Sequence, residues 1–162
     1  MIVVTGAGGR LGRLVADRLV RAGKDVVGTD RVPADSPDFK FVLGDLSDSE
    51  MVSDLVRGAD AVVHMGAIPG PRSRGQIETF ENNVSSTFNV MMAAAEHGVR
   101  RIVFSSSAFG MGWAHDPSAF VPLYLPLDAD HPMMPFETYG LSKQIGEDIG
   151  AMLARSTDIS MV

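Results

Sequence analysis

The chain has 162 residues, of which 45% are hydrophobic and 21% charged, and this composition is ordinary for one globular domain. Its net charge of −6 argues against nucleic acid or an anionic membrane surface as a partner, because such partners require clustered Lys and Arg side chains. The absence of Cys excludes disulfides, thiol chemistry and Cys-ligated metal, and no stretch approaches the apolar length of a membrane helix.

The first predicted element is a short buried strand. Residues 2–4 are Ile-Val-Val, the β-branched composition that is typical of a parallel strand. Since this strand starts directly after Met1, with no room for a secretory leader, we expect a cytoplasmic protein. Glycines interrupt the run, and the apolar spacing from Leu11 to Ala22 then predicts an amphipathic helix that ends at Gly23.

Gly6, Gly9 and Gly12 connect the strand to this helix with the spacing G-x-x-G-x-x-G. The spacing permits a tight turn and a close approach to a pyrophosphate, which would bind the N-terminal amides of the helix. The next strand ends in Asp30, about 20 residues further on, where a carboxylate can bond the adenosine ribose hydroxyls. A 2′-phosphate would face Asp30, which favours NAD over NADP, although the adjacent Arg31 weakens this preference. The alternatives are an ordinary tight turn and a solvated acid.

Three further strands are predicted, at residues 25–30, 39–43 and 60–67. Between the last two, Ser47 begins Ser-Asp-Ser-Glu, a capping box that predicts a helix up to Gly58. His64 lies inside the strand at 60–67 and has no partner at metal-ligand spacing. We therefore interpret it as a satisfied core or strand-edge histidine.

A long helix follows, with apolar residues at helical spacing from Phe80 to Ala95. The remaining predicted elements are a strand at 101–105, a helix at 139–155 and the start of a sixth strand at 158–162. Together they predict an α/β fold: a Rossmann-type doubly wound parallel sheet with helices on both faces, in which residues 1–162 form one NAD(P)-binding domain. Because a natural domain rarely ends within a central strand, we expect a truncated chain that lacks a C-terminal substrate region.

Two loops carry polar side chains. Arg72 and Arg74 lie in a loop rich in Pro and Gly at 68–75 and could clamp an anionic substrate, although two loop arginines are more often solvated. Residues 110–136 form a loop long enough to be a lid or a binding segment. We interpret its titratable residues as loop polarity and predict no metal site: His115, Asp128, Asp130 and His131.

Tyr139 and Lys143 are spaced i and i+4, so their side chains rise from one face of the last helix. When an alcohol is oxidised by hydride loss, a nearby base must take its proton, but a phenol with a pKa of about 10 is uncharged at neutral pH. The Lys143 ammonium is expected to lower the pKa of Tyr139, while a serine hydroxyl bonds the substrate oxygen. The alternative is an ordinary exposed helix pair.

Short motifs extend this pattern along the chain: the glycine turn, Asp30, Gly44-Asp45-Leu46, His64-Met65-Gly66-Ala67, Asn83-Val84, Phe104-Ser105-Ser106-Ser107-Ala108 and Tyr139-Gly-Leu-Ser-Lys143. With them, essentially the whole chain resembles the extended short-chain dehydrogenase/reductase family, in its NAD-dependent epimerase/dehydratase branch. The Tyr139 motif and the following Gly146-Glu147-Asp148 are most similar to uronate dehydrogenases, and the serine run to sugar-nucleotide epimerases.

The resemblance implies a role for each matching residue. The pyrophosphate would be held by Gly6, Gly9, Arg10, Leu11 and Gly12. The adenosine would be held by Asp30 at its ribose and by Asp45 and Leu46 at its adenine. The path to the nicotinamide would be lined by Gly66 and Ala67, and Asn83 would support the active-site helix and its water. The catalytic residues would be Ser107, Tyr139 and Lys143, and the last two would also contact the cofactor.

The serine assignment depends on the reference glycine. Ser107 matches the catalytic Ser or Thr of the family by its distance before Gly112, whereas with Gly110 as the reference the match becomes Ser106 or Ser105. The chain departs from the family at two places, because Met-Gly replaces the usual Tyr-Gly after the serine run and the loop before the last helix is longer than in many members.

We therefore expect an NAD-dependent enzyme that transfers hydride at a carbinol carbon of a sugar or sugar nucleotide, as a dehydrogenase or an epimerase. Dehydration is least favoured, because Ala108-Phe109 stands where dehydratases place an acid-base pair. The expected partners are the small-molecule sugar substrate and a second copy in a homodimer. The alternative is a dinucleotide-binding sensor or scaffold without turnover, against which the Ser, Tyr and Lys set argues.

Overall fold

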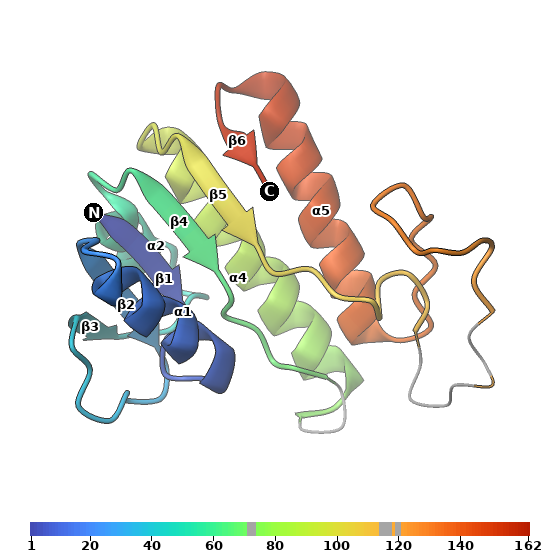
Figure 1. Ribbon diagram of the computed structural model, residues 1–162, viewed down its shortest axis with the longest axis horizontal. Helices are drawn as coiled ribbons and strands as arrows, with labels where there is room; N and C mark the ends of the chain where they lie inside the picture. Colours follow the sequence, from blue (N-terminus) through green and yellow to red (C-terminus); the bar gives the residue numbers. More distant parts are fainter. Residues whose placement is uncertain (71–73, 114–117, 119–120) are drawn as a thin grey trace.

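The computed structural model describes residues 1–70, 74–113, 118 and 121–162, so Arg72 and His115 lie outside the described residues. Within them one sheet contains β1 (Ile2–Thr5), β2 (Val26–Asp30), β3 (Lys40–Leu43), β4 (Ala61–His64), β5 (Arg101–Phe104) and β6 (Ser160–Met161). Their order is β3-β2-β1-β4-β5-β6, and each neighbouring pair is parallel (Figure 1). The order therefore reverses between β1 and β4, the place where open α/β sheets bind ligands.

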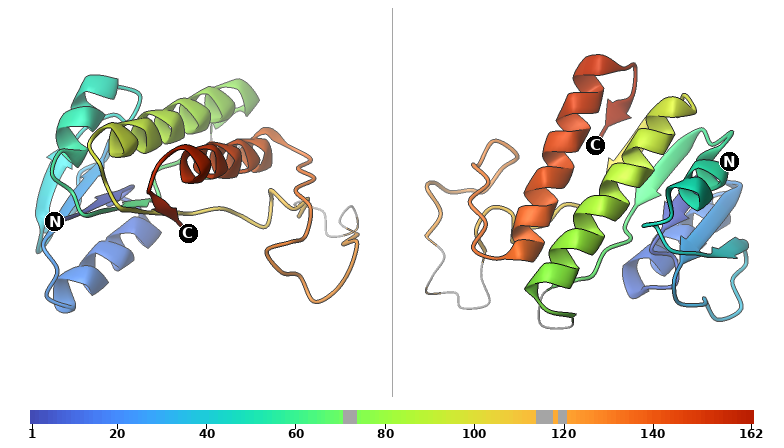
Figure 2. Two further views of the ribbon diagram at one scale, coloured as in Figure 1. Left: turned by 90° about the horizontal axis from the view of Figure 1, so that it is seen from above. Right: turned by 180° about the vertical axis from the view of Figure 1, so that it is seen from behind.

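Helices cover both faces of the sheet: α1 (Arg10–Arg21), α2 (Ser49–Val56), α4 (Gln76–Glu96) and α5 (Thr138–Ser156). Figure 2 shows α1 on one face and α2, α4 and α5 on the other. Successive side chains of β1 point to opposite faces of the sheet and so contribute to both cores. Val3 belongs to the core that includes α4 residues, whereas Val4 packs in the smaller core with Ala16 of α1. The predicted doubly wound sheet with helices on both faces is confirmed.

Most element boundaries differ from the prediction by a few residues, and two of the differences have a clear cause in the hydrogen bonds. The strand predicted at 60–67 ends at His64, because the next two backbone amides donate to the Thr5 side chain. The capping residue of α2 is Asp48, not Ser47: its Oδ1 accepts hydrogen bonds from the amides of Glu50 and Met51, each at 3.1 Å. The Ser47 amide instead donates to Asp45 at 2.9 Å.

A buried hydrogen-bond chain joins the carboxyl ends of β1 and β4. Thr5 Oγ1 accepts from the amides of Met65 at 3.1 Å and Gly66 at 3.0 Å, which fills both acceptor positions of a hydroxyl. Its own hydrogen is therefore donated to Nδ1 of His64, 2.7 Å away. His64 Nε2 consequently carries the ring proton and donates to Thr87 Oγ1 at 3.1 Å. His64 is thus a neutral core histidine with both nitrogens satisfied, as interpreted from the sequence.

This histidine makes the fold acid-sensitive. Burial foremost, and then the charge of Lys143, lower the pKa of His64 from 6.5 to about 3. Below pH 6.5 the unfolded chain takes up a proton that the folded chain refuses, so the free energy of unfolding falls as the pH falls toward 3, by up to about 1.4 kcal/mol per pH unit. Urea unfolding at a series of pH values measures this slope.

The matched variants are His64→Asn, which retains an acceptor for Thr5 but does not titrate, and His97→Gln, which changes a half-buried histidine bonded to Ser53 at the end of α4. His64→Asn is expected to have a shallower slope between pH 6.5 and 3, because only the carboxylates still contribute there, and His97→Gln is expected to keep the wild-type slope. An equally steep slope in His64→Asn would contradict the assignment.

The glycine turn brings α1 close to β1. Gly6 has a φ of +72°, which favours glycine, and a Cβ added at Gly12 would overlap the Gly6 carbonyl oxygen. A Cβ at Gly9 would lie 3.3 Å from the same oxygen, a contact that a small shift relieves. The third glycine of the motif is therefore required by helix packing.

We expect Gly12→Ala to lower the free energy of unfolding by about 1–3 kcal/mol, because the added methyl forces α1 away from the turn. Gly9→Ala is the matched control and should cost less. Chemical denaturation of both variants checks the difference, and equal losses would mean that α1 does not pack against the turn as described.

Candidate functional site

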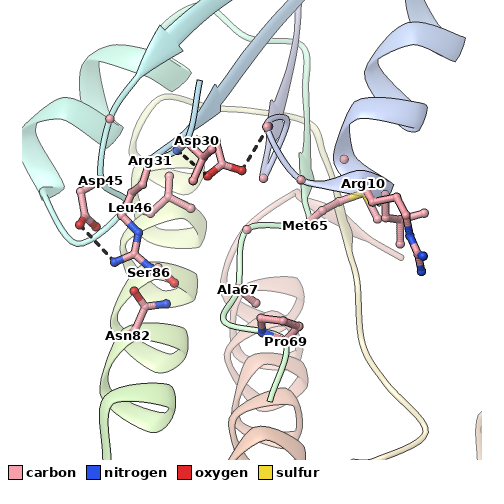
Figure 3. Close-up of a pocket in the computed structure, with 18 residues that line it drawn as sticks. Arg10, Asp30, Arg31, Asp45, Leu46, Met65, Ala67, Pro69, Asn82 and Ser86 are labelled. Atoms are coloured by element: carbon pink, nitrogen blue, oxygen red, sulfur yellow. Dashed lines mark hydrogen bonds and ion pairs between the residues drawn. The ribbon is translucent and has the colours of Figure 1, made fainter. Parts of the chain in front are cut away.

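A pocket of about 560 Å³ opens where the strand order reverses (Figure 3). The segments that follow β1, β2, β3 and β4 form its walls, together with one side of α4. Most of the predicted cofactor residues line it: Gly6, Gly9, Arg10, Leu11, Gly12, Asp30, Asp45, Leu46, Gly66 and Ala67. The other lining residues were not predicted as cofactor contacts, although Arg31, Gly44 and Met65 stand in or beside the motifs quoted above: Gly8, Arg31, Val32, Gly44, Met65, Pro69, Asn82 and Ser86.

The N-terminus of α1 borders the pocket without a side-chain cap. Its capping residue is Gly9, and its first turn contains no acidic residue. Amide groups left without a cap at a helix N-terminus, together with the positive end of the helix dipole, are suited to a pyrophosphate. The glycine turn therefore fits the predicted phosphate contact.

Two backbone amides orient the Asp30 carboxylate. Gly8 donates to Oδ2 and Val32 to Oδ1, each at 3.1 Å. Gly8 approaches so closely that a Cβ there would overlap the Val32 carbonyl oxygen. Since a carboxylate has about four lone-pair positions, Asp30 can still accept bonds from ribose hydroxyls. Gly8 belongs to a Gly-Gly pair in the sequence, which was the available signal for it.

An ion pair crosses the neighbouring part of the pocket. Arg31 Nη1 lies 3.5 Å from Asp45 Oδ2, and each side chain is 43% exposed. The Ser47 backbone amide foremost, and the Arg31 guanidinium with it, hold the pKa of Asp45 below its usual value. Figure 3 shows the Arg31 side chain running from the end of β2 toward Asp45, while the Asp30 carboxylate points toward the glycine turn.

The predicted catalytic residues come together after β5 and on α5. The Ser107 hydroxyl accepts from the Phe109 amide at 3.2 Å and lies near the Tyr139 phenol, whose pKa it lowers. Lys143 Nζ donates to the Ser105 carbonyl at 2.7 Å and lies 5.6 Å from the centre of the Tyr139 ring. It lies 4.8 Å from the Phe104 ring centre. An alcohol, a phenol and an ammonium thus share one side of α5.

The predicted lowering of the pKa of Tyr139 by Lys143 is wrong for this chain. Burial foremost, with the nearby Glu137 carboxylate, raises the pKa of Tyr139, and the Ser107 hydroxyl is what lowers it. Lys143 is itself only 5% exposed, and burial lowers its pKa to about 8. The Lys143 ammonium donates to the Ser105 carbonyl, and the pKa of Tyr139 is set mainly by the burial of its phenol.

A cap fixes the first turn of α5. The Glu137 carboxylate accepts from the amides of Tyr139 at 2.9 Å and Gly140 at 2.6 Å. Gly140 has no room for a Cβ, because the Phe109 carbonyl lies against it. The Phe109 ring meets Tyr139 edge-on, with 6.0 Å between ring centres. The residues after the serine run thereby place the phenol.

The three candidate serines make different contacts. Ser106 donates to Glu147, and Ser105 contributes its carbonyl to Lys143, whereas the Ser107 hydroxyl lies near Tyr139. These contacts favour Ser107 over the other two matches.

Asn83 does not line the pocket. Its side chain bonds both backbone groups of Ile68, at 2.8 and 3.0 Å, and Ser142 Oγ at 3.3 Å. It is buried and joins α4 to the segment after β4 and to α5. This contact with α5 agrees with the predicted support of the active-site helix and not with a direct cofactor contact.

The two loops show local contacts. Arg74 forms an exposed ion pair with Glu78 at 3.3 Å. The Tyr124 hydroxyl donates to Asp128 at 2.8 Å. In the described part of the chain, no three His, Asp or Glu residues are grouped as metal ligands, and none of the helices has the length and apolarity to cross a membrane.

Several known proteins are similar to this chain in sequence and in architecture. A uronate dehydrogenase from Pseudomonas putida is 33% identical over 93% of this chain and 54% of its own length. A putative UDP-glucose 4-epimerase from Methanocaldococcus jannaschii is 30% identical over 91% of this chain and 49% of its own. A short-chain dehydrogenase/reductase superfamily protein from Agrobacterium tumefaciens, crystallised with bound NAD, is 36% identical, covers all of this chain with 47% of its own, and superposes with a TM-score of 0.87.

The chain spans about half the length of the curated relatives it matches. A model of the NAD dependent epimerase/dehydratase family matches residues 2–162. Sheet order, glycine turn and the Ser, Tyr and Lys contacts agree with that match, and the chain belongs to the NAD-dependent epimerase/dehydratase family.

Proposed function

We propose that the pocket binds NAD(H). The uncapped N-terminus of α1 suits the pyrophosphate, and the Asp30 carboxylate, held by two amides, suits the adenosine ribose. The A. tumefaciens protein with bound NAD supports this assignment. When bound, the nicotinamide accepts or returns a hydride, which the side chains cannot do.

We further propose an NAD-dependent oxidoreductase or epimerase that acts at a carbinol carbon of a sugar or sugar nucleotide. The observation that carries this proposal is the placement of the buried Lys143, bonded to the Ser105 carbonyl at 2.7 Å and 5.6 Å from the Tyr139 ring centre, with the Ser107 hydroxyl near the phenol. Conversion of a carbinol to a carbonyl removes a hydride from carbon and a proton from oxygen. Tyr139 Oη receives this proton in oxidation and returns it to the carbonyl oxygen in reduction.

The three side chains divide the work. Ser107 donates to the substrate oxygen or to the phenolate as negative charge develops, in keeping with its lowering of the pKa of Tyr139. Lys143 holds the Ser105 carbonyl and thereby the segment that carries Ser107. The family resemblance assigns its ammonium a contact with the nicotinamide ribose as well. Because burial raises the pKa of Tyr139, the phenol is protonated at neutral pH, which is the form that gives its proton to a carbonyl in reduction. In oxidation the phenol must first release this proton to solvent, so that the phenolate can accept the proton of the carbinol.

The names of the relatives support the substrate class. One relative is named a uronate dehydrogenase and another a putative UDP-glucose 4-epimerase, so the first name points to a sugar acid and the second to a sugar nucleotide. A sensor without turnover would have no use for a phenol placed against Ser107. The homodimer and the cytoplasmic location stay predictions.

The test compares the two tyrosines of the chain. Full-length protein is incubated with NAD and a panel of free uronic acids and sugar nucleotides, while reduced nicotinamide and sugar products are followed. Tyr139→Phe should lower kcat at least about 100-fold, because it removes the proton carrier, and change the Kd for NAD less than about twofold. Tyr124→Phe, which removes a hydroxyl bonded to Asp128, should keep the wild-type rate.

Tight NAD binding that Tyr139→Phe does not affect, together with no turnover, would contradict the enzyme proposal and favour a dinucleotide-binding sensor. Equal losses in the two variants would mean that Tyr139 acts only through the fold.

A further inference from the structure

Arg31 is a cation at the end of the pocket that Asp30 also lines, yet it is already engaged. Its guanidinium lies 3.5 Å from Asp45 across the pocket wall (Figure 3). Arg10, the other basic side chain of the lining, lies at the opposite end of the same view. The charges near Asp30 are therefore two carboxylates and one guanidinium paired with one of them.

A 2′-phosphate would need a free cation at this place. It would face the Asp30 carboxylate, whose oxygens are fixed by the amides of Gly8 and Val32 and cannot turn away without losing both bonds. Arg31 follows Asp30 directly and is the group that could compensate. Asp45 competes for that guanidinium, and its own position is held by the Ser47 amide at 2.9 Å.

We infer that Asp45 is a specificity-determining residue for the dinucleotide: by pairing with Arg31 it withholds that guanidinium from a 2′-phosphate, so that NAD is selected over NADP. Two effects thus select NAD over NADP: the Asp30 carboxylate repels the 2′-phosphate, and the Arg31 guanidinium is paired with Asp45. This inference rests on the proposed NAD site but not on the proposed catalytic residues.

The test measures the Kd for NAD and for NADP by isothermal titration calorimetry of the full-length protein without substrate. Asp45→Asn keeps an oxygen that can accept from Ser47 but removes the charge that holds Arg31. The ratio of NADP to NAD affinity should rise about fivefold, the change that about 1 kcal/mol represents for an exposed pair. The rise should shrink at high salt, since it is electrostatic.

Two controls isolate the pair. Asp54→Asn removes another exposed carboxylate, one that pairs with Arg57 on α2 at 2.9 Å and does not line the pocket, and should leave the ratio unchanged. Arg31→Ala combined with Asp45→Asn should abolish the gain, because the guanidinium is then absent.

An unchanged ratio in Asp45→Asn, or a rise that persists without Arg31, would overturn the inference while NAD binding and the proposed function stand. A wild-type protein that binds neither dinucleotide would overturn the proposed function and this inference together. Loss of turnover in Tyr139→Phe bears on the catalytic proposal alone.

Discussion

The hydroxyl of Thr5 connects the carboxyl ends of β1 and β4, where the strand order of the sheet reverses. Thr5 and His64 are register partners on β1 and β4, so their side chains meet on the same face. The amides of Met65 and Gly66 donate to the Thr5 oxygen, and its hydrogen goes to His64. Because each hydrogen-bonding position is filled, the segment that follows β4 leaves the sheet at a fixed angle and becomes the wall of the pocket.

The same layer supports the catalytic side. His64 stacks on Phe104 with 5.8 Å between ring centres, and the Lys143 ammonium lies over the same Phe104 ring. A neutral imidazole is compatible with this cation, whereas a second charge in the layer would repel it. The cofactor pocket and the pair of Ser107 and Tyr139 thus rest on one continuous set of side chains from β1 to α5, in which Thr5, His64 and Lys143 are buried and Phe104 is half-buried.

Periodicity predicted the sheet and its helices, because buried strands and amphipathic helices have regular apolar spacings. The glycine spacing and the family resemblance predicted most of the pocket. The cap of α2 was misplaced by one residue, since Ser47 and Asp48 are both good caps and only the contact of the Ser47 amide with Asp45 decides between them. Asn82 and Ser86 were missed because their side of α4 lacks an apolar pattern. The pKa of Tyr139 could not be predicted from its i+4 lysine, since burial depends on contacts from distant segments such as Phe109.

The buried Lys143 serves the proposed catalysis but lowers the stability of the folded state. Its pKa of about 8 in the fold, below the ordinary 10.5, means that the unfolded chain holds a proton more readily over this interval, so protein stability increases as the solution becomes alkaline through it. At neutral pH the ammonium is a standing liability to the native state that an aliphatic side chain would not impose. If variants of this protein were selected for stability alone, with no selection for turnover, replacement of Lys143 would accordingly be among the first changes.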